Sequence, residues 1–295
     1  MDKIQKISII TSLLGLWFTS FFSNNVQIII GFLLIFVFGI LHGANDLIII
    51  TSLKQENNNK NFLKILISYL LIITITSSLF IFAPSLAIML FIVISGYHFG
   101  EQHWQNLKEG ISKKNKILFS LNYGMFILLL LFKFHIPEVQ TIIQNITSHL
   151  IPITVFKISL FIASLVLLIQ SIWLINRSNY FAKNAVLQIL FLIVFAIIFK
   201  VGSLIWGFTI YFIMWHSLPS LNDQIKFLYG SYSLKNFISY LKSALVYWVL
   251  SLLGIMILYY LLKDETIFEA IFFSFLAAIT FPHVWVISKM FEKTS

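Results

Sequence analysis

The sequence contains no cysteine among its 295 residues. This absence excludes disulfide bonds, zinc–thiolate sites, cysteine-ligated iron–sulfur clusters and thiol nucleophiles. A metal ion bound by this chain must therefore be held by nitrogen and oxygen atoms.

Charged residues are also scarce. They make up 11% of the chain, whereas hydrophobic residues make up 59%; a soluble domain has about 25% charged and 45–50% apolar residues. The composition therefore predicts an integral membrane protein, and we expect a single transmembrane domain over residues 1–295. The formal charge of +9 is carried by loops and forms no basic helical stripe, so we expect no nucleic-acid partner.

Ten apolar runs are long enough to cross a hydrocarbon core of about 30 Å. The first lacks a small-residue cleavage pattern, so we expect it to be a retained helix and not a signal peptide. Residues 135–150 and 221–236 are less apolar and are predicted to form loops or interfacial segments. The sequence thus predicts an all-α, polytopic membrane bundle of about ten helices. The runs are 7–22, 26–53, 62–83, 84–104, 117–134, 152–175, 185–200, 202–219, 240–262 and 267–290.

The cations predict the orientation of this bundle. If the amino terminus is cytoplasmic, 16 of the 20 basic residues lie in loops and tails on the inner side of the membrane. The other four lie on the outer side or within spans: Lys133, Lys157, Lys200 and Lys263. Cytoplasmic loops of membrane proteins carry such an excess of Lys and Arg. We therefore predict that both termini face the cytoplasm and that the protein is a multi-pass component of the inner cell membrane.

Four of the predicted spans each carry a histidine at a similar depth. His42, His98, His216 and His283 lie 14 to 16 residues after the outer starts of their runs, or roughly 21–24 Å into the membrane. A lone intramembrane histidine is usually an interhelical hydrogen-bonding group. Four in one layer favour a metal site, and we predict that all four are ligands.

Further polar residues accompany these histidines. Asp46 follows His42 by four residues and Glu101 follows His98 by three, so each shares a helical face with its histidine. Asp46 is therefore predicted to accept a hydrogen bond from a ligating imidazole. Glu101 is predicted either to do the same or to be a solvated residue near the inner surface. His103 lies about 140° round the helix from His98, and we expect it to be a neighbour of the site or an interfacial anchor. His135 and His149 are assigned no role.

An all-imidazole site suits iron, copper or zinc, and the sequence does not choose among them. Aromatic residues near the four histidines would form an apolar binding pocket, although most aromatics in this chain must face lipid or pack in the core. The candidate substrate-binding residues are Tyr97, Trp206, Tyr211, Trp215, Phe281 and Trp285.

The motifs around the histidines also resemble a known family. They are His-Gly-x-x-Asp at 42–46, His-Phe-Gly-Glu at 98–101, Trp-His-Ser at 215–217 and Pro-His at 282–283. In this order, on a polytopic chain of this length, they are similar to the Brp/Blh family of bacterial and archaeal β-carotene 15,15′-dioxygenases. Each motif alone is weak, but the resemblance covers nearly the whole chain.

The resemblance implies an iron(II)-dependent membrane enzyme that splits β-carotene centrally with O2 into two molecules of all-trans-retinal. It implies ligand roles for His42, His98 and His216, with lipid around the protein and a retinal-binding rhodopsin as a recipient of the product. Many family members carry another histidine one turn after the position of His216, where this chain has Ser220. The fourth ligand is therefore His283, by its depth, or His103.

Two other classes of protein also fit a buried cluster of histidine and aspartate. A transporter or proton-relay protein would carry such groups at mid-membrane, but inverted repeats are expected there and none stands out. A membrane haem protein would use histidine pairs as axial ligands, and a Soret absorbance would reveal it.

Overall fold

The described residues of the chain, 3–54, 59–262 and 265–294 in the computed structural model, form helices and no strand. Nine helical segments among them are long and apolar enough to cross a membrane, which confirms a polytopic helical membrane protein. The first predicted span forms α1 (Lys3–Thr19), a helix of 17 residues. It is apolar but shorter than the other nine segments.

Contacts between Cα atoms divide the chain into two compact units, each assembled from separate stretches of sequence. Unit 1 comprises Met1–Ile35, Ile92–Thr141 and Leu150–His216, and unit 2 comprises Phe36–Phe91, Ile142–His149 and Ser217–Ser295. The expectation of one domain stays a prediction.

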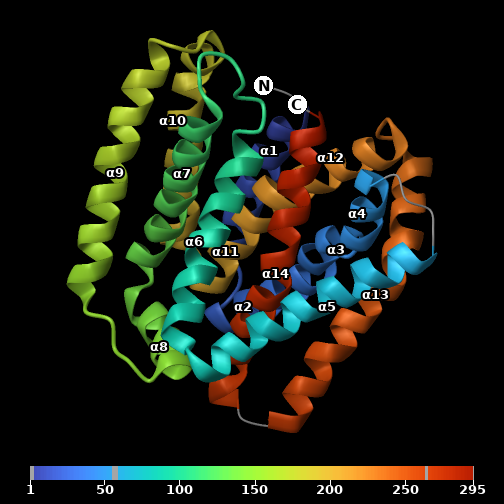
Figure 1. Cartoon of the computed structure of the whole chain (residues 1–295). Coiled ribbons are helices and arrows are strands. Elements are labelled where there is room, and N and C mark those ends of the chain that lie inside the picture. Colours follow the sequence, from blue (N-terminus) through green and yellow to red (C-terminus); the bar gives the residue numbers. More distant parts are fainter. Residues whose placement is uncertain (1–2, 55–58, 263–264, 295) are drawn as a thin grey trace. The chain divides into compact units, whose positions relative to one another are not determined.

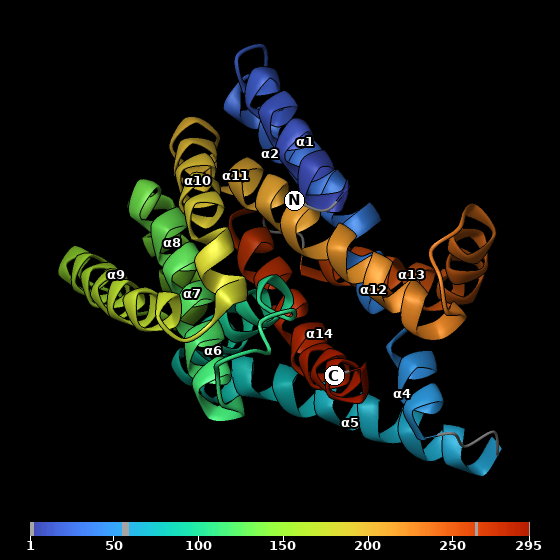
Figure 2. The same cartoon turned by 90° about the horizontal axis from the view of Figure 1, so that it is seen from above.

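Unit 1 is built around long apolar helices that lie side by side. In it α7 (Lys113–Phe134), α9 (Ile153–Ile175) and α10 (Asn179–Val201) contact one another (Figures 1 and 2). Helix α11 (Leu204–Tyr211) packs on α2 (Asn24–Leu34) and on α10. The unit also holds α1, the second part of α6 (Pro84–His103) and the first part of α8 (Ile136–Thr147).

Unit 2 is built around α5 (Asn59–Phe82) and α14 (Glu265–Thr294), which lie against each other (Figure 2). Helix α4 (Asp46–Lys54) packs against both, and their shared core includes Ile49, Val286 and Met290. Helix α13 (Leu234–Leu262) contacts α14, α3 (Ile40–Gly43) and α12 (Leu218–Tyr229).

Two π-helical stretches interrupt the predicted spans. They are η1 (Ile35–Gly39), which precedes α3, and η2 (Phe212–Ser217), which connects α11 to α12. Such π-bulges shift the helical register by one residue and occur frequently at functional sites. The first ends three residues before His42, and the second contains His216.

Most span boundaries agree with the sequence prediction to within a few residues, but the loop alternative is wrong for both of the less apolar stretches. Residues 221–229 continue the span as α12 instead of leaving it as a loop. Pro219 lies in the first turn of α12, where the missing N–H of proline costs no helical hydrogen bond. The loop alternative for residues 135–150 is also wrong, because most of them form α8.

Candidate metal centre

Unit 1 contains a buried pair of histidines, His98 on α6 and His216 on η2. Their ring centroids lie 4.4 Å apart with an angle of 75° between the planes. One ring nitrogen of each lies within 4.8 Å of the other, and both residues are buried. Two imidazoles at this distance and angle can bind the same ion.

Close backbone packing positions His98. A Cβ atom on Gly100 would lie 1.8 Å from the carbonyl oxygen of Ser120, and one on Gly124 would lie 1.8 Å from that of Gly96. Only glycine permits helices α6 and α7 to approach so closely, as small residues do in other membrane bundles. Since His98 lies between Gly96 and Gly100, this contact fixes the depth and the direction of its side chain.

The π-helical stretch and aromatic rings position His216. Its ring stacks on that of Phe212 with centroids 5.5 Å apart and lies edge-on to that of Phe99 at 4.8 Å. Phe99 also contacts Tyr211, with ring centroids 5.6 Å apart. The pair in unit 1 therefore has apolar, aromatic walls.

Unit 2 contains the second buried pair, His42 on α3 and His283 on α14. Their ring centroids lie 4.7 Å apart at 88°, and one ring nitrogen of each lies within 4.8 Å of the other. A Cβ atom on Gly43 would lie 3.5 Å from Nδ1 of His283, so the absence of a side chain there leaves this ring close to the backbone of α3.

Hydrogen bonds fix the orientation of both rings in unit 2. Nδ1–H of His42 donates to the carbonyl oxygen of Gly39, at the end of η1. Nδ1–H of His283 donates to Oδ1 of Asp46 at 2.8 Å, and the Tyr69 hydroxyl donates to Oδ2 at 2.7 Å. A proton held on Nδ1 makes Nε2 the ring nitrogen that can bind a metal.

The structure gives Asp46 a hydrogen bond to a buried histidine, but the histidine differs from the one that the sequence suggested. Its partner is His283, 237 residues away, and not His42. The helix is interrupted here, because α3 ends at Gly43 and α4 begins at Asp46. The geometry of a continuous helix, on which the prediction rested, does not apply there.

A second polar network holds the backbone at His42. Its carbonyl oxygen accepts a hydrogen bond from Nε2 of Gln224 at 2.8 Å, and Oε1 of Gln224 accepts one from the Tyr240 hydroxyl at 2.7 Å. Gln224 also donates to Oγ of Ser220 at 3.0 Å, and all three partners are buried. Ser220 thus takes part in holding α3 to α12 in this chain.

The sequence alone does not indicate a role for Tyr69, Gln224 or Tyr240. No motif or periodicity distinguishes them from the many other aromatic and polar residues of the spans. Only the contacts between elements distant in sequence, such as α3 with α12 and α4 with α5, reveal them.

Glu101 and His103 have partners of their own in unit 1. Oε1 of Glu101 accepts a hydrogen bond from the Tyr97 hydroxyl at 2.5 Å. Nε2–H of His103 donates to Oε1 of Gln188 at 2.6 Å, and the Tyr123 hydroxyl oxygen lies 3.2 Å from the same nitrogen. These bonds give His103 a role in joining α6, α7 and α10.

The other aromatic candidates fall into different environments. The indole N–H of Trp215 donates to Oγ of Ser12 at 2.9 Å, and that of Trp206 donates to the carbonyl oxygen of Gly15 at 3.3 Å. Both tryptophans and Tyr211 are buried in unit 1. Phe281 is half-buried and Trp285 is exposed on α14.

The donor set fits a metal ion. Each unit contains a buried histidine pair, and these four histidines could bind a metal. Neutral imidazoles without thiolates suit iron, copper or zinc. The structure thus supports metal binding in general and does not select the ion.

Comparison with known proteins gives one match. A family model described as "Beta-carotene 15,15'-dioxygenase" matches residues 33–291, a range that includes both histidine pairs. No curated protein and no solved structure matches the chain significantly.

Proposed function

Because this chain belongs to the beta-carotene 15,15'-dioxygenase family and is a carotenoid-cleaving dioxygenase, we propose that it cleaves the central double bond of β-carotene. One O2 supplies one oxygen atom to each half, which gives two molecules of all-trans-retinal. The observation that carries the proposal is the pair of buried histidines in each unit, both within the matched range.

We propose that His42, His98, His216 and His283 hold one iron(II) ion. Triplet oxygen does not add to a closed-shell polyene unaided, so O2 must be activated. Bound iron would supply this activation. Zinc would not, because it has no redox chemistry. The orientation of the His42 and His283 rings by Gly39 and Asp46 supports the ligand roles of this pair. The shared depth that the sequence predicts for all four supports one common ion.

His283 is favoured over His103 as the fourth ligand. His283 lies against His42 and is bonded through Nδ1 to a carboxylate, an arrangement typical of metal-bound histidine. His103 instead bonds to Gln188 and Tyr123.

The substrate and the product are both apolar. The length of the substrate is close to the thickness of a bilayer core, roughly 30 Å, and the product is shorter. We therefore propose that β-carotene enters from the lipid, and that retinal leaves into the same membrane, where a retinal-binding rhodopsin could take it up. The inner cell membrane and the cytoplasmic position of both termini belong to this proposal. Family membership favours it over the transporter and haem alternatives.

Expression in cells that accumulate β-carotene tests the activity directly. We expect the cells to lose their colour and to contain retinal, which chromatography detects, whereas cells that produce His216→Ala should keep their colour. Persistent colour in cells with correctly inserted wild-type protein would refute the proposed function.

A further inference from the structure

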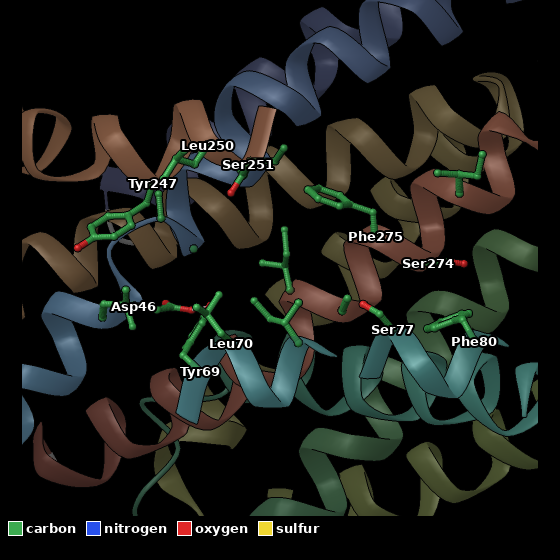
Figure 3. A pocket seen from close by; sticks show the side chains of 18 of the residues that line it. Asp46, Tyr69, Leu70, Ser77, Phe80, Tyr247, Leu250, Ser251, Ser274 and Phe275 are labelled. Carbon is green, nitrogen blue, oxygen red and sulfur yellow. The ribbon is translucent and has the colours of Figure 1, made fainter. Parts of the chain in front are cut away.

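Unit 2 contains a cavity of about 930 Å³ between α5, α13 and α14, with α3 and α4 at one end. Ligand pockets in proteins have volumes of about 300–1,000 Å³, so this cavity has room for a large ligand. Figure 3 shows Asp46 and Tyr69 together at one end, and Ser77 and Phe80 toward the other.

The cavity follows one face of α5, and we name it the α5 groove. The residues of α5 that line it extend from Leu66 to Ile81. Counted from Leu66, the next four lie three, four, seven and eleven residues further on, which places them on one side of the helix. The fifteen helical steps from Leu66 to Ile81, at a rise of 1.5 Å each, make the groove about 22 Å long.

The inner end of the α5 groove adjoins the histidine pair of unit 2. Gly43, Asp46 and Tyr69 line it. Asp46 is hydrogen-bonded to His283, and Gly43 follows His42 directly and faces the His283 ring. A molecule that fills the groove to this end therefore lies beside the pair.

The remaining wall is mostly apolar and opens to the lipid-facing surface. Ile73, Phe80 and Phe275 line it. Leu70, Leu250 and Ile81 also line it, and they are 51%, 59% and 75% exposed. In a membrane these side chains meet hydrocarbon, so an apolar ligand can enter sideways without crossing water.

We propose that the α5 groove binds one half of the carotenoid, with the polyene along α5 and the ring near Phe80 and Ile81. The inference rests on the proposed function and names the part of the chain that places the central bond. A carotenoid of roughly 30 Å, the thickness of the bilayer core, has a half-length of about 15 Å. The groove accommodates that length and leaves the central bond next to His42 and His283.

The Ser77→Phe variant tests the proposal because Ser77 lies about 12 Å along α5 from Tyr69, within the length that the half-chain needs. The matched control is Ser68→Phe, since Ser68 is exposed, lies 180° round the helix from Ser77 and does not line the groove. The substrates are β-carotene and a β-apocarotenal, in which one half has lost its ring and ends in an aldehyde. A shortened groove still accommodates the truncated half.

We expect Ser77→Phe to lower kcat/KM for β-carotene by at least about 10- to 200-fold, because one extra methylene in a hydrophobic pocket already changes it by that much. The variant should lower kcat/KM for the apocarotenal much less. Ser68→Phe should change neither. If wild-type protein cleaves neither substrate, the proposed function fails and this inference fails with it. If wild-type protein cleaves both and Ser77→Phe reduces both equally, the groove assignment is overturned while the function stands.

A binding measurement independent of turnover uses the absence of cysteine from the chain. Ser77→Cys and Ser68→Cys each introduce one thiol, and its reaction with a maleimide is followed under nitrogen, without O2. We expect β-carotene to slow labelling of the Ser77→Cys variant several-fold and to leave that of Ser68→Cys unchanged. Equal labelling rates of Ser77→Cys with and without β-carotene would overturn the inference.

Discussion

Replacement of Asp46 by asparagine tests how the chain orients the proposed ligand His283. The carboxylate accepts two hydrogen bonds, from Nδ1–H of His283 at 2.8 Å and from the Tyr69 hydroxyl at 2.7 Å. Asparagine keeps the shape of the side chain. Its amide oxygen can accept from His283, and its amide group can donate to the tyrosine oxygen, so the geometry survives and the charge does not.

The expected loss follows from the strengths of these bonds. A hydrogen bond to a charged group contributes about 1.5–3 kcal/mol and one between neutral groups about 0.5–1.5 kcal/mol, a difference of about 1–1.5 kcal/mol. At about 1.4 kcal/mol per factor of ten, Asp46→Asn should weaken iron binding about tenfold. Asp46→Ala removes the acceptor and should weaken it up to about 100-fold, the upper range for such partners of metal ligands. Tyr69→Phe should have the smallest effect, because it leaves the bond to His283 intact.

The assay is competition for iron(II) between the purified protein and a chelator of known affinity, under nitrogen. Thermal unfolding of the same samples without metal separates a loss of affinity from a loss of fold. Asp223→Asn makes the same chemical change elsewhere in unit 2, where Asn222 donates to Oδ1 of Asp223, and should leave the affinity unchanged. Wild-type affinity in a folded Asp46→Asn protein would refute the orienting role of Asp46.

Three further predictions concern the ligands, the packing and the ion. His216→Ala should abolish bound iron and activity, whereas His149→Ala should retain both by metal analysis and retinal assay; iron at wild-type level in His216→Ala would contradict the ligand assignment. Gly100→Ala should lower the unfolding temperature, because its Cβ would lie 1.8 Å from the Ser120 carbonyl oxygen and overpacking costs about 1–3 kcal/mol or more. Gly254→Ala, whose Cβ meets its nearest neighbour at 3.9 Å, should keep or raise that temperature; equal losses in both would contradict the packing argument. Removal of the metal with a chelator should abolish cleavage, and iron(II) but not zinc should restore it; restoration by zinc would exclude the proposed chemistry.

The sequence predicts the spans well because hydrophobic length is a local property. The run 152–175, for example, differs from α9 by one residue. Prediction fails at Pro219, where a proline that usually ends a helix lies in the first turn of the next helical segment. The π-helical stretches were not predicted, since they depend on packing between distant elements.

The sequence also predicts the depth of the four histidines but not their neighbours. Depth follows from the count of residues along a helix, whereas the pairing of His98 with His216, and of His42 with His283, depends on which helices are adjacent and how each is rotated about its axis. Tyr69 shows the same limit, because its bond to Asp46 joins two helices whose contact no local pattern encodes.

The central claim, that both histidine pairs bind one iron ion, is tested most directly by metal analysis of the protein purified under nitrogen. We expect one iron per chain in the wild type and none in either His42→Ala or His98→Ala, because each variant breaks a different pair. Absence of iron from active wild-type protein, two irons per chain, or full iron content in either variant would contradict the claim.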